Sequence, residues 1–347
     1  MILSLFIFLF LQKINCLDND DIDNDDESHQ ISWDEVPVQE VIIIGSGPAG
    51  STAGIYLGRS GHKPLILHGQ YAGGQLMMTS EVENFPTFKG TGTELSRAIH
   101  SQAQQSGAIF IEDEIASANL TSNPKRLIGF NGEKYRSKAV IIATGAKARY
   151  LGIQNEQKYL NRGVSACATC DGPLYKNQKV AVVGGGDSGV TEALILSKIC
   201  SNVTLIHRSA NLTASLPMRK KLSESNVTVI RRHTVVDVIG DEYVTGIQIR
   251  NVDTDEFFVL SVSALFVAIG RIPETSVFAD EVGVDKQKYF VKRPSIYGES
   301  TATKIPGVFV AGDCADPVYR QAITSAGSGC QAALDVERYL NRIESEE

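Results

Sequence analysis

The chain has 347 residues, of which 43% are hydrophobic, with 31 glycines and a formal net charge of −7. Its length suits two domains rather than one, and its apolar content is sufficient for substantial cores. Residues 1–35 contain nine acids and one base and carry −8, which leaves about +1 for the rest of the chain. The folded part is therefore near neutral, and without a basic stripe it is not expected to bind nucleic acid.

The N-terminal segment is unusual in composition. Residues 1–11 are nearly all apolar but too few to span a bilayer comfortably. Residues 1–16 resemble a signal peptide cleaved after Cys16, although Lys13 lies on the wrong side of the apolar run. A mis-assigned start codon or a non-functional extension is the alternative. Residues 17–37 are acidic and poor in apolar residues, and we expect them to form a disordered linker.

Order is expected from Val38 onward. Val41–Ile44 predicts a short buried strand, residues 51–60 a helix, and residues 64–67 a second strand that ends at His68, where an acid usually binds ribose hydroxyls. The GxGxxG turn between strand and helix is typical of a dinucleotide-binding fold, because its glycines allow a tight turn and close approach of a pyrophosphate to the helix N-terminus. The residues predicted to bind this nucleotide are Gly45, Gly47, Pro48, Ala49 and Gly50.

The next segment combines loops with a small β layer. Residues 94–106 predict a helix, and residues 109–119 and 127–135 predict strands of that layer. A buried strand over residues 139–142 then ends in a turn of small residues. The loop and turn residues expected to line the same cofactor are Gly74, Gln75, Asn84, Ala143, Thr144 and Gly145.

Two of the six cysteines, Cys167 and Cys170, form a CxxC pair that is followed at once by Asp171. A structural zinc site needs four ligands, and neither a second CxxC nor histidines at metal-ligand spacing are present, so no metal is expected. The cysteines are also too sparse for the disulfide scaffold of a small secreted protein. A redox role therefore remains for the pair. The isolated thiols are expected to be packing residues, with a redox role of Cys314 as an alternative: Cys200, Cys314 and Cys330.

A second complete dinucleotide motif follows the CxxC pair. Residues 179–183 predict a strand, residues 190–199 a helix, and residues 203–206 a second strand that ends in His207-Arg208. A base at that position suits a 2′-phosphate, which favours NADPH over NADH. The residues predicted to bind this nucleotide are Gly184, Gly186, Asp187, Ser188, Gly189, His207, Arg208, Ile269, Gly270 and Arg271.

The C-terminal segment returns to the first nucleotide. Residues 307–313 predict a strand and a turn ending in Asp313, whose carboxylate suits a ribityl hydroxyl. Arg320, Gln321 and Ala322 precede a small-residue helix over 323–340, whose N-terminus suits negative charge on a reduced flavin. Two motifs with matching frames imply two bound nucleotides. The predicted fold class is α/β with two Rossmann-like domains.

With these motifs in order over residues 38–342, the chain resembles the low-molecular-weight thioredoxin reductases. The motifs that carry the resemblance are Gly45–Gly50, Gly73–Leu76, Val82–Pro86, Ala143–Gly145, Cys167–Gly172, Gly184–Gly189, Val267–Arg271 and Gly307–Ala322. The resemblance implies an FAD domain of residues 38–148 and 275–347, with an NADPH domain of residues 149–274 inserted into it. It also implies thioredoxin as partner, a homodimer and a cytoplasmic location. A secretory location is the alternative if residues 1–16 direct export, and membrane contact would then be transient.

The resemblance assigns roles to the redox residues. Cys170 would lie next to the flavin, Cys167 would attack the partner disulfide, and Asp171 would handle the proton; the alternative for Asp171 is a simple turn residue. The family usually has further arginines at the positions of Ser209 and Thr213, so weaker discrimination for NADPH is expected here.

The order of the motifs has a mechanistic consequence. The disulfide and the bound nicotinamide would belong to the same domain, and the two cannot contact the same face of the flavin at once. We therefore expect this domain to rotate between the two half-reactions, with hinges near 147–151 and 271–276. Three alternatives remain open. They are a peroxiredoxin-system reductase, a small-molecule dithiol oxidase, and a non-catalytic flavin-binding or redox-sensing protein.

Overall fold

The computed structural model describes residues 32–70, 72–79 and 82–346. The expectations for residues 1–16, including Cys16, and for most of the linker at 17–37 lie outside these residues. The chain divides into a short N-terminal unit that ends at Val36 and a large unit, Pro37–Glu347. The described part of the short unit is a 3-10 turn, η1 (Trp33–Glu35), in which the Ser32 N–H donates to the Glu35 carboxylate at 3.1 Å.

The first sheet of the large unit has seven strands in the order β5-β2-β1-β8-β7-β6, with β19 paired to β8. Strands β5, β2, β1, β8 and β19 are parallel neighbours, and β6 and β7 add an antiparallel edge. The nine-residue β8 pairs with β7 over its first half and with β19 over its second. The strand bounds are β1 (Val38–Ile44), β2 (Leu65–His68), β5 (Ile109–Glu112), β6 (Ile115–Asn119), β7 (Lys125–Gly129), β8 (Lys134–Ile142) and β19 (Val308–Val310).

Two of the predicted strands are wrong in their bounds. The run 109–119 is split into β5 and β6, and the run 127–135 is broken by a turn between β7 and β8. The turn contains Asn131-Gly132, in which Gly132 has a φ of +82°. Apolar residues on both sides of this turn made it resemble one continuous strand, although the glycine allows the chain to reverse there.

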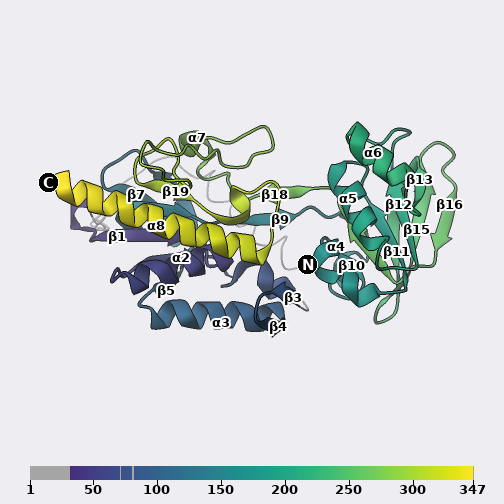
Figure 1. Cartoon of the computed structure of the whole chain (residues 1–347), viewed down its shortest axis with the longest axis horizontal. Helices are drawn as coiled ribbons and strands as arrows, with labels where there is room; N and C mark the ends of the chain where they lie inside the picture. Colours follow the sequence, from purple (N-terminus) through teal and green to yellow (C-terminus); the bar gives the residue numbers. More distant parts are fainter. Residues whose placement is uncertain (1–31, 71, 80–81, 347) are drawn as a thin grey trace, which may run out of the picture. The chain divides into compact units, whose positions relative to one another are not determined.

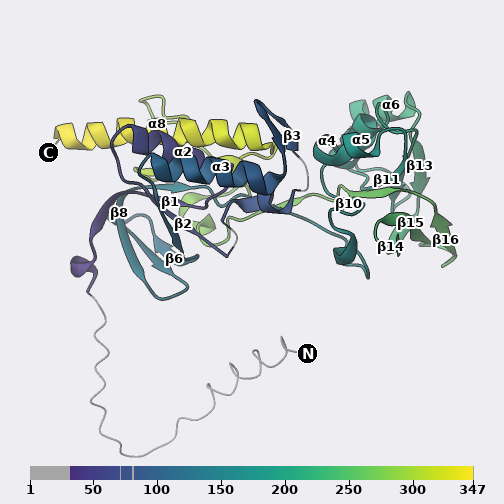
Figure 2. The same cartoon turned by 90° about the horizontal axis from the view of Figure 1, so that it is seen from below.

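Three helices lie together on one face of this sheet: α2 (Pro48–Arg59), α3 (Gly92–Gln105) and α8 (Ala322–Glu346) (Figure 2). α8, drawn in yellow, packs along α2 (Figure 1). α2 begins three residues earlier than predicted, because Pro48 suits the first turn of a helix. α3 begins at Gly92 with Thr91 and Glu94 as a capping box, and α8 runs six residues beyond the predicted end.

The second sheet is a five-stranded parallel sheet in the order β10-β17-β11-β12-β13. Its strands are β10 (Val164–Ser165), β11 (Lys179–Val183), β12 (Asn202–His207), β13 (Thr228–Arg231) and β17 (Ala264–Val267). Its helices are α4 (Ala168–Asp171), α5 (Asp187–Leu196) and α6 (Leu216–Ser223), and an antiparallel sheet follows with β14 (His233–Gly240), β15 (Val244–Asn251) and β16 (Phe257–Leu260). The predicted α/β class with two Rossmann-like units is confirmed.

The chain passes twice between the part that forms the first sheet and the part that forms the second, and we call these two connecting segments the crossings. β9 (Ala146–Ala148) and β18 (Arg271–Pro273) pair with each other as an antiparallel ribbon, and Lys147 Nζ lies 3.1 Å from Glu274 Oε2 beside it. The two segments proposed as hinges therefore overlap one ribbon. The remaining short elements are β3 (Val82–Phe85), β4 (Phe88–Gly90), α7 (Ala279–Val282), η2 (Gly74–Met78), η3 (Gln157–Tyr159), η4 (Gly172–Tyr175) and η5 (Gly312–Cys314).

Within residues 32–70, 72–79 and 82–346, no helix is both long and apolar enough to cross a membrane.

Candidate redox site

The first glycine turn has the close contacts that its sequence predicts. Gly45 has a φ of +108°, and a Cβ there would lie 2.3 Å from the Ala143 carbonyl oxygen. A Cβ on Gly50 would lie 1.8 Å from the Gly45 carbonyl oxygen. A Cβ on Gly47 would meet nothing within 4 Å. Two glycines are thus required by the turn itself, whereas the third leaves open space at the N-terminus of α2, where a phosphate can approach the backbone.

The second glycine turn repeats this geometry. Gly184 has a φ of +141°, and its added Cβ would lie 2.3 Å from the Ala268 carbonyl oxygen. A Cβ on Gly189 would lie 2.2 Å from the Gly184 carbonyl oxygen, whereas one on Gly186 would have Thr213 Oγ1 at 3.6 Å as its nearest neighbour. The second turn therefore also has an open middle glycine at a helix N-terminus, and it fits a second dinucleotide.

A cavity of ≈ 640 Å³ lies at the first turn. It is lined by residues that are far apart in the sequence, from Ile44 to Ser325. Of the residues predicted to bind FAD, Gly50 alone does not line it, because Gly50 lies beneath the turn. The others line it together: Gly45, Gly47, Pro48, Ala49, Gly74, Gln75, Asn84, Ala143, Thr144, Gly145, Asp313, Arg320, Gln321 and Ala322.

Asp313 is held by the first turns of α8. Ser325 Oγ donates to Asp313 Oδ1 at 2.8 Å. Burial raises the pKa of the Asp313 carboxyl, and the Ser325 hydrogen bond and Arg271 oppose this shift. A largely buried carboxyl facing a cavity suits a ligand that offers hydroxyl groups.

The turn before α8 is fixed by a second acid, Asp316. Its carboxylate accepts N–H groups from Val318, Tyr319 and Arg320 at 2.9, 2.9 and 3.0 Å. Burial acts to raise the pKa of Asp316, but these three donors lower it overall. Arg320 takes a φ of +52° at the end of this turn, which brings it and Gln321 to the cavity.

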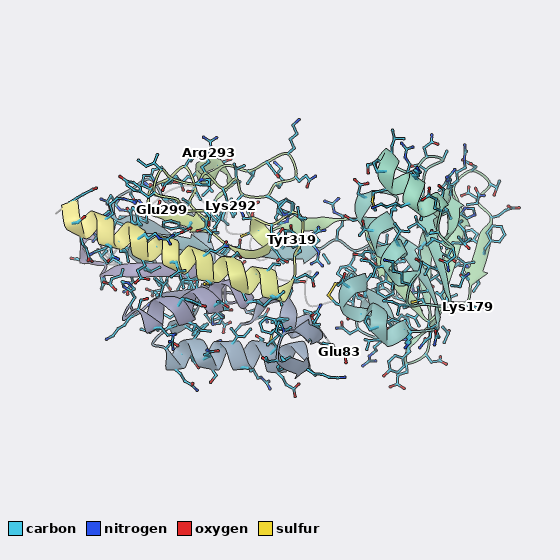
Figure 3. The ribbon with its side chains drawn as sticks, viewed as in Figure 1. Glu83, Lys179, Lys292, Arg293, Glu299 and Tyr319 are labelled. Atoms are coloured by element: carbon cyan, nitrogen blue, oxygen red, sulfur yellow. A yellow bond between two sulfur atoms is a disulfide. The ribbon has the colours of Figure 1, made fainter. Side chains whose placement is uncertain are left out.

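Cys167 and Cys170 are joined by a disulfide, as the CxxC spacing predicts. Figure 3 draws it as a yellow bond. Cys167 is the N-cap of the short helix α4, and its Sγ accepts the Cys170 N–H at 3.2 Å. Both cysteines line the cavity, so the disulfide opens onto the same space as the first glycine turn.

Asp171 also lines this cavity. Burial raises the pKa of its carboxyl, and a hydrogen bond from the Ser165 side chain opposes the shift. Asp171 Oδ1 is buried and has no hydrogen-bond partner among the described residues. A carboxyl with a raised pKa and a free oxygen is suited to hold a proton beside the disulfide.

The residues predicted for the second nucleotide lie elsewhere, apart from Arg271, which lines the cavity. His207 is buried with its ring beneath Gly185, and its Nε2 lies 3.0 Å from the Asn211 carbonyl oxygen. Arg208 is exposed and forms no ion pair within the described part of the chain. Asp187 Oδ1 accepts the Ser215 N–H at 2.7 Å and so fixes the loop above this turn. Of the two bases at the end of β12, His207 and Arg208, Arg208 is the one exposed to a ligand.

Several lining residues were missed by sequence reasoning. Five of them lie in loops, Ser165 ends β10 and Ser325 lies in α8, and no local pattern marks the set: Tyr150, Asn161, Ser165, Glu274, Ser276, Phe278 and Ser325. The one signal in the sequence was Ser325, which lies in the first turn of a helix that begins with predicted site residues. Among residues 32–70, 72–79 and 82–346, no group of three or more His, Cys, Asp or Glu side chains is placed to hold a metal ion.

Comparison with known proteins places this geometry in a family. Residues 39–329 match the pyridine nucleotide-disulphide oxidoreductases. A thioredoxin reductase of Coxiella burnetii is 46% identical over 310 residues, which cover 87% of this chain and 97% of the relative. The solved thioredoxin reductase of Giardia duodenalis is 37% identical with a TM-score of 0.82, over 87% of this chain and 98% of that one. A Lactococcus lactis thioredoxin reductase described as the FR conformation is 32% identical with a TM-score of 0.60, over 88% and 99%.

Proposed function

Because the chain belongs to the pyridine nucleotide-disulphide oxidoreductases, as a thioredoxin reductase, we propose that it reduces a thioredoxin disulfide with electrons from NADPH, through FAD and the Cys167–Cys170 pair. The observation that carries this proposal is one cavity shared by the first glycine turn, the disulfide and Asp171. The family uses a flavin and a nicotinamide nucleotide. FAD and NADPH are the particular nucleotides that we propose.

FAD fits the first cavity. Its pyrophosphate would face Gly47 at the N-terminus of α2, where an added Cβ meets nothing within 4 Å. Its ribityl hydroxyls would meet Asp313, and its isoalloxazine would lie near Gln321, Ala322 and the disulfide. Bound there, FAD would supply the two-electron chemistry, taking a hydride from NADPH and passing electrons to the disulfide.

The redox residues then act in sequence. Two electrons break the S–S bond, with Cys170 as the sulfur next to the flavin, and Asp171 gives a proton to the nascent thiolate pair. Cys167 attacks one sulfur of the thioredoxin disulfide, and the displaced sulfur leaves as a thiolate that takes up a proton. Cys170 then returns its proton to Asp171 and attacks the Cys167 sulfur of the mixed disulfide, which closes the Cys167–Cys170 bond again. The second thioredoxin sulfur leaves as a thiolate and takes up a proton, so thioredoxin is released as a dithiol. The Cys170 N–H on Cys167 Sγ supports the first attack, because it stabilises a thiolate there.

NADPH would bind the second glycine turn, with its 2′-phosphate at Arg208. We expect Arg208→Ala to raise KM for NADPH by roughly tenfold and to leave KM for NADH nearly unchanged, because one charge-assisted contact is lost. Steady-state kinetics with both nucleotides measure the ratio. Lys179→Ala is the matched control, since Lys179 is exposed and begins β11, whereas the turn follows the other end of that strand (Figure 3). Equal losses with NADPH and NADH would contradict the placement of the phosphate.

A rotation of the NADPH-binding domain between half-reactions is also part of the proposal. The second glycine turn does not line the cavity, yet a nicotinamide held there must come within about 3–3.5 Å of the flavin. The solved relatives support such movement, since they cover similar shares of this chain but superpose with TM-scores of 0.82 and 0.60. The β9–β18 ribbon is the proposed hinge, because both crossings between the domains pair there.

Locking this rotation is expected to abolish turnover. An engineered disulfide between β3 and α4, which contact each other, should reduce thioredoxin reduction at least about a hundredfold while FAD stays bound. The measurement is NADPH consumption with oxidised thioredoxin, first with the engineered bond closed and then after dithiothreitol has opened it and has been removed. Full turnover in the locked state would rule the rotation out.

The proposed function itself is tested by adding NADPH to the purified flavoprotein and then oxidised thioredoxin. We expect the flavin absorbance near 450 nm to bleach and thioredoxin to reoxidise it. Absence of bleaching would reject the proposal. Bleaching without thioredoxin turnover would favour a reductase of another disulfide or a dithiol oxidase. A homodimer and a cytoplasmic location are proposed from the family alone.

A further inference from the structure

A carboxyl group lies directly behind the redox turn without lining the cavity. α5 packs against α4, and the carboxyl of Glu192 on α5 faces the N–H of Ala168, the first residue of α4. α5 also packs against the end of this turn, where a Cβ on Gly172 would lie 3.0 Å from Leu196 Cδ2. Glu192 and Leu196 are one helical turn apart, as are Ala168 and Gly172, so the two contacts form one continuous seam.

The Glu192 carboxyl is only partly satisfied. Its Oε2 atom is buried and has no hydrogen-bond partner among the described residues. Burial raises the pKa of Glu192 to about 7, opposed by Arg271, the Ala168 N–H and Arg320, and assisted by Asp171. This group therefore gains or loses a negative charge near neutral pH, at a fixed place behind the cysteine pair.

The redox turn is where that charge has its effect. The Cys170 N–H donates to Cys167 Sγ, and the Glu192 carboxyl faces the Ala168 N–H of the same short turn. An ionised carboxylate disfavours a second negative charge close by, whereas a neutral carboxyl does not. The charge on Glu192 and the charge on Cys167 are therefore coupled.

We propose that Glu192 is a positioning residue that holds the start of α4 and, through its charge, sets how readily Cys167 forms a thiolate. The inference rests on the proposed role of Cys167 as the attacking thiol. Below neutral pH Glu192 is protonated and neutral, so it does not oppose a thiolate on Cys167. Above neutral pH Glu192 is ionised, and its negative charge makes the Cys167 thiolate less stable. Glu192 thereby restrains the nucleophile as pH rises.

The test measures the reactivity of the Cys167 thiol. In the full chain carrying Cys170→Ser, Cys167 is a free thiol, and its alkylation by iodoacetamide is followed by peptide mass spectrometry from pH 5.5 to 10. Adding Glu192→Gln keeps the acceptor and removes the charge. We expect equal rates near pH 6, a rate about fivefold higher in the Gln variant near pH 8, and equal rates again near pH 10.

Other charges facing Glu192 do not confuse this comparison. Arg271 from β18 and Arg320 from the turn before α8 keep their charge in both proteins, so their contributions cancel in the ratio of rates. Asp171 from α4 is itself coupled to Glu192, so the same pair of proteins is also compared with Asp171→Asn added to both, and the difference near pH 8 should persist. Glu224→Gln is the matched control, because Glu224 is exposed at the end of α6 and should leave the profile unchanged.

Superimposable profiles for the Gln variant and its parent would overturn the proposal. If circular dichroism shows that the Gln variant is unfolded, Glu192→Asp takes its place. This variant retains the carboxyl charge, so its alkylation profile should keep the change of slope near pH 7 that ionisation of this carboxyl produces. Loss of that change of slope would equally overturn the proposal. The readout needs neither NADPH nor thioredoxin, so it remains decisive even if thioredoxin reduction were disproved.

Discussion

Replacing Cys170 by serine is expected to reduce thioredoxin reduction by more than about a thousandfold while NADPH still bleaches the flavin. The reason is that the S–S bond can no longer form, so electrons reach the cofactor and stop there. Cys167→Ser should cause the same loss. Stopped-flow absorbance separates the two half-reactions, because flavin reduction and thioredoxin turnover are recorded in one sample.

The control for this result is a cysteine outside the site. Cys330 lies half-buried on α8 and forms no disulfide, so Cys330→Ser should keep normal turnover. Asp171→Asn should reduce the rate of thioredoxin reduction by roughly 10²- to 10⁴-fold, because a proton donor is removed but the disulfide remains. Substantial turnover in Cys170→Ser would show that electrons leave the flavin by another route, as in a direct oxidase.

Gly47→Val is expected to give a folded protein that holds FAD at least about a hundredfold more weakly. The protein itself has room for the side chain, since an added Cβ meets nothing within 4 Å, whereas the added methyl groups would occupy the place of the pyrophosphate. Fluorescence titration with FAD gives the affinity. Thermal unfolding should be compared between flavin-free proteins, because a bound ligand raises the melting temperature by itself.

The matched variant, Gly50→Val, should instead destabilise the fold itself. Gly50→Val places a Cβ 1.8 Å from the Gly45 carbonyl oxygen, so the first turn of α2 cannot form on β1, and we expect a loss of more than about 4 kcal/mol of folding free energy. Urea unfolding of the flavin-free proteins measures this difference. A Gly47→Val protein that purifies with stoichiometric flavin would contradict the placement of FAD at this turn.

Local motifs could be predicted because their requirements are satisfied by neighbouring residues. The buried runs before each glycine turn, such as Val41–Ile44, form strands that are buried on both faces. Gly45 and Gly184 need positive φ, and Gly50 and Gly189 need the absence of a Cβ. The spacing of Cys167 and Cys170 allows a disulfide without help from distant segments. For the same reason the class of the fold and the redox chemistry followed from the sequence alone.

Side chains brought together by distant segments were not predictable. Ser325 meets Asp313, and Glu192 meets the start of α4, through helix packing that no local pattern encodes. His207 looked like part of a phosphate grip, yet its ring is buried beneath Gly185 and Arg208 alone of the pair is exposed.

The sequence by itself thus determined two dinucleotide turns and one redox pair, because backbone geometry at each depends on adjacent residues. Only the tertiary structure decided that the disulfide opens onto the cavity of the first turn and not onto the second, since that requires residues from 45 to 325 to converge. It also decided that both domain crossings pair as the β9–β18 ribbon, because strand pairing between segments more than a hundred residues apart is set by the packing of whole sheets.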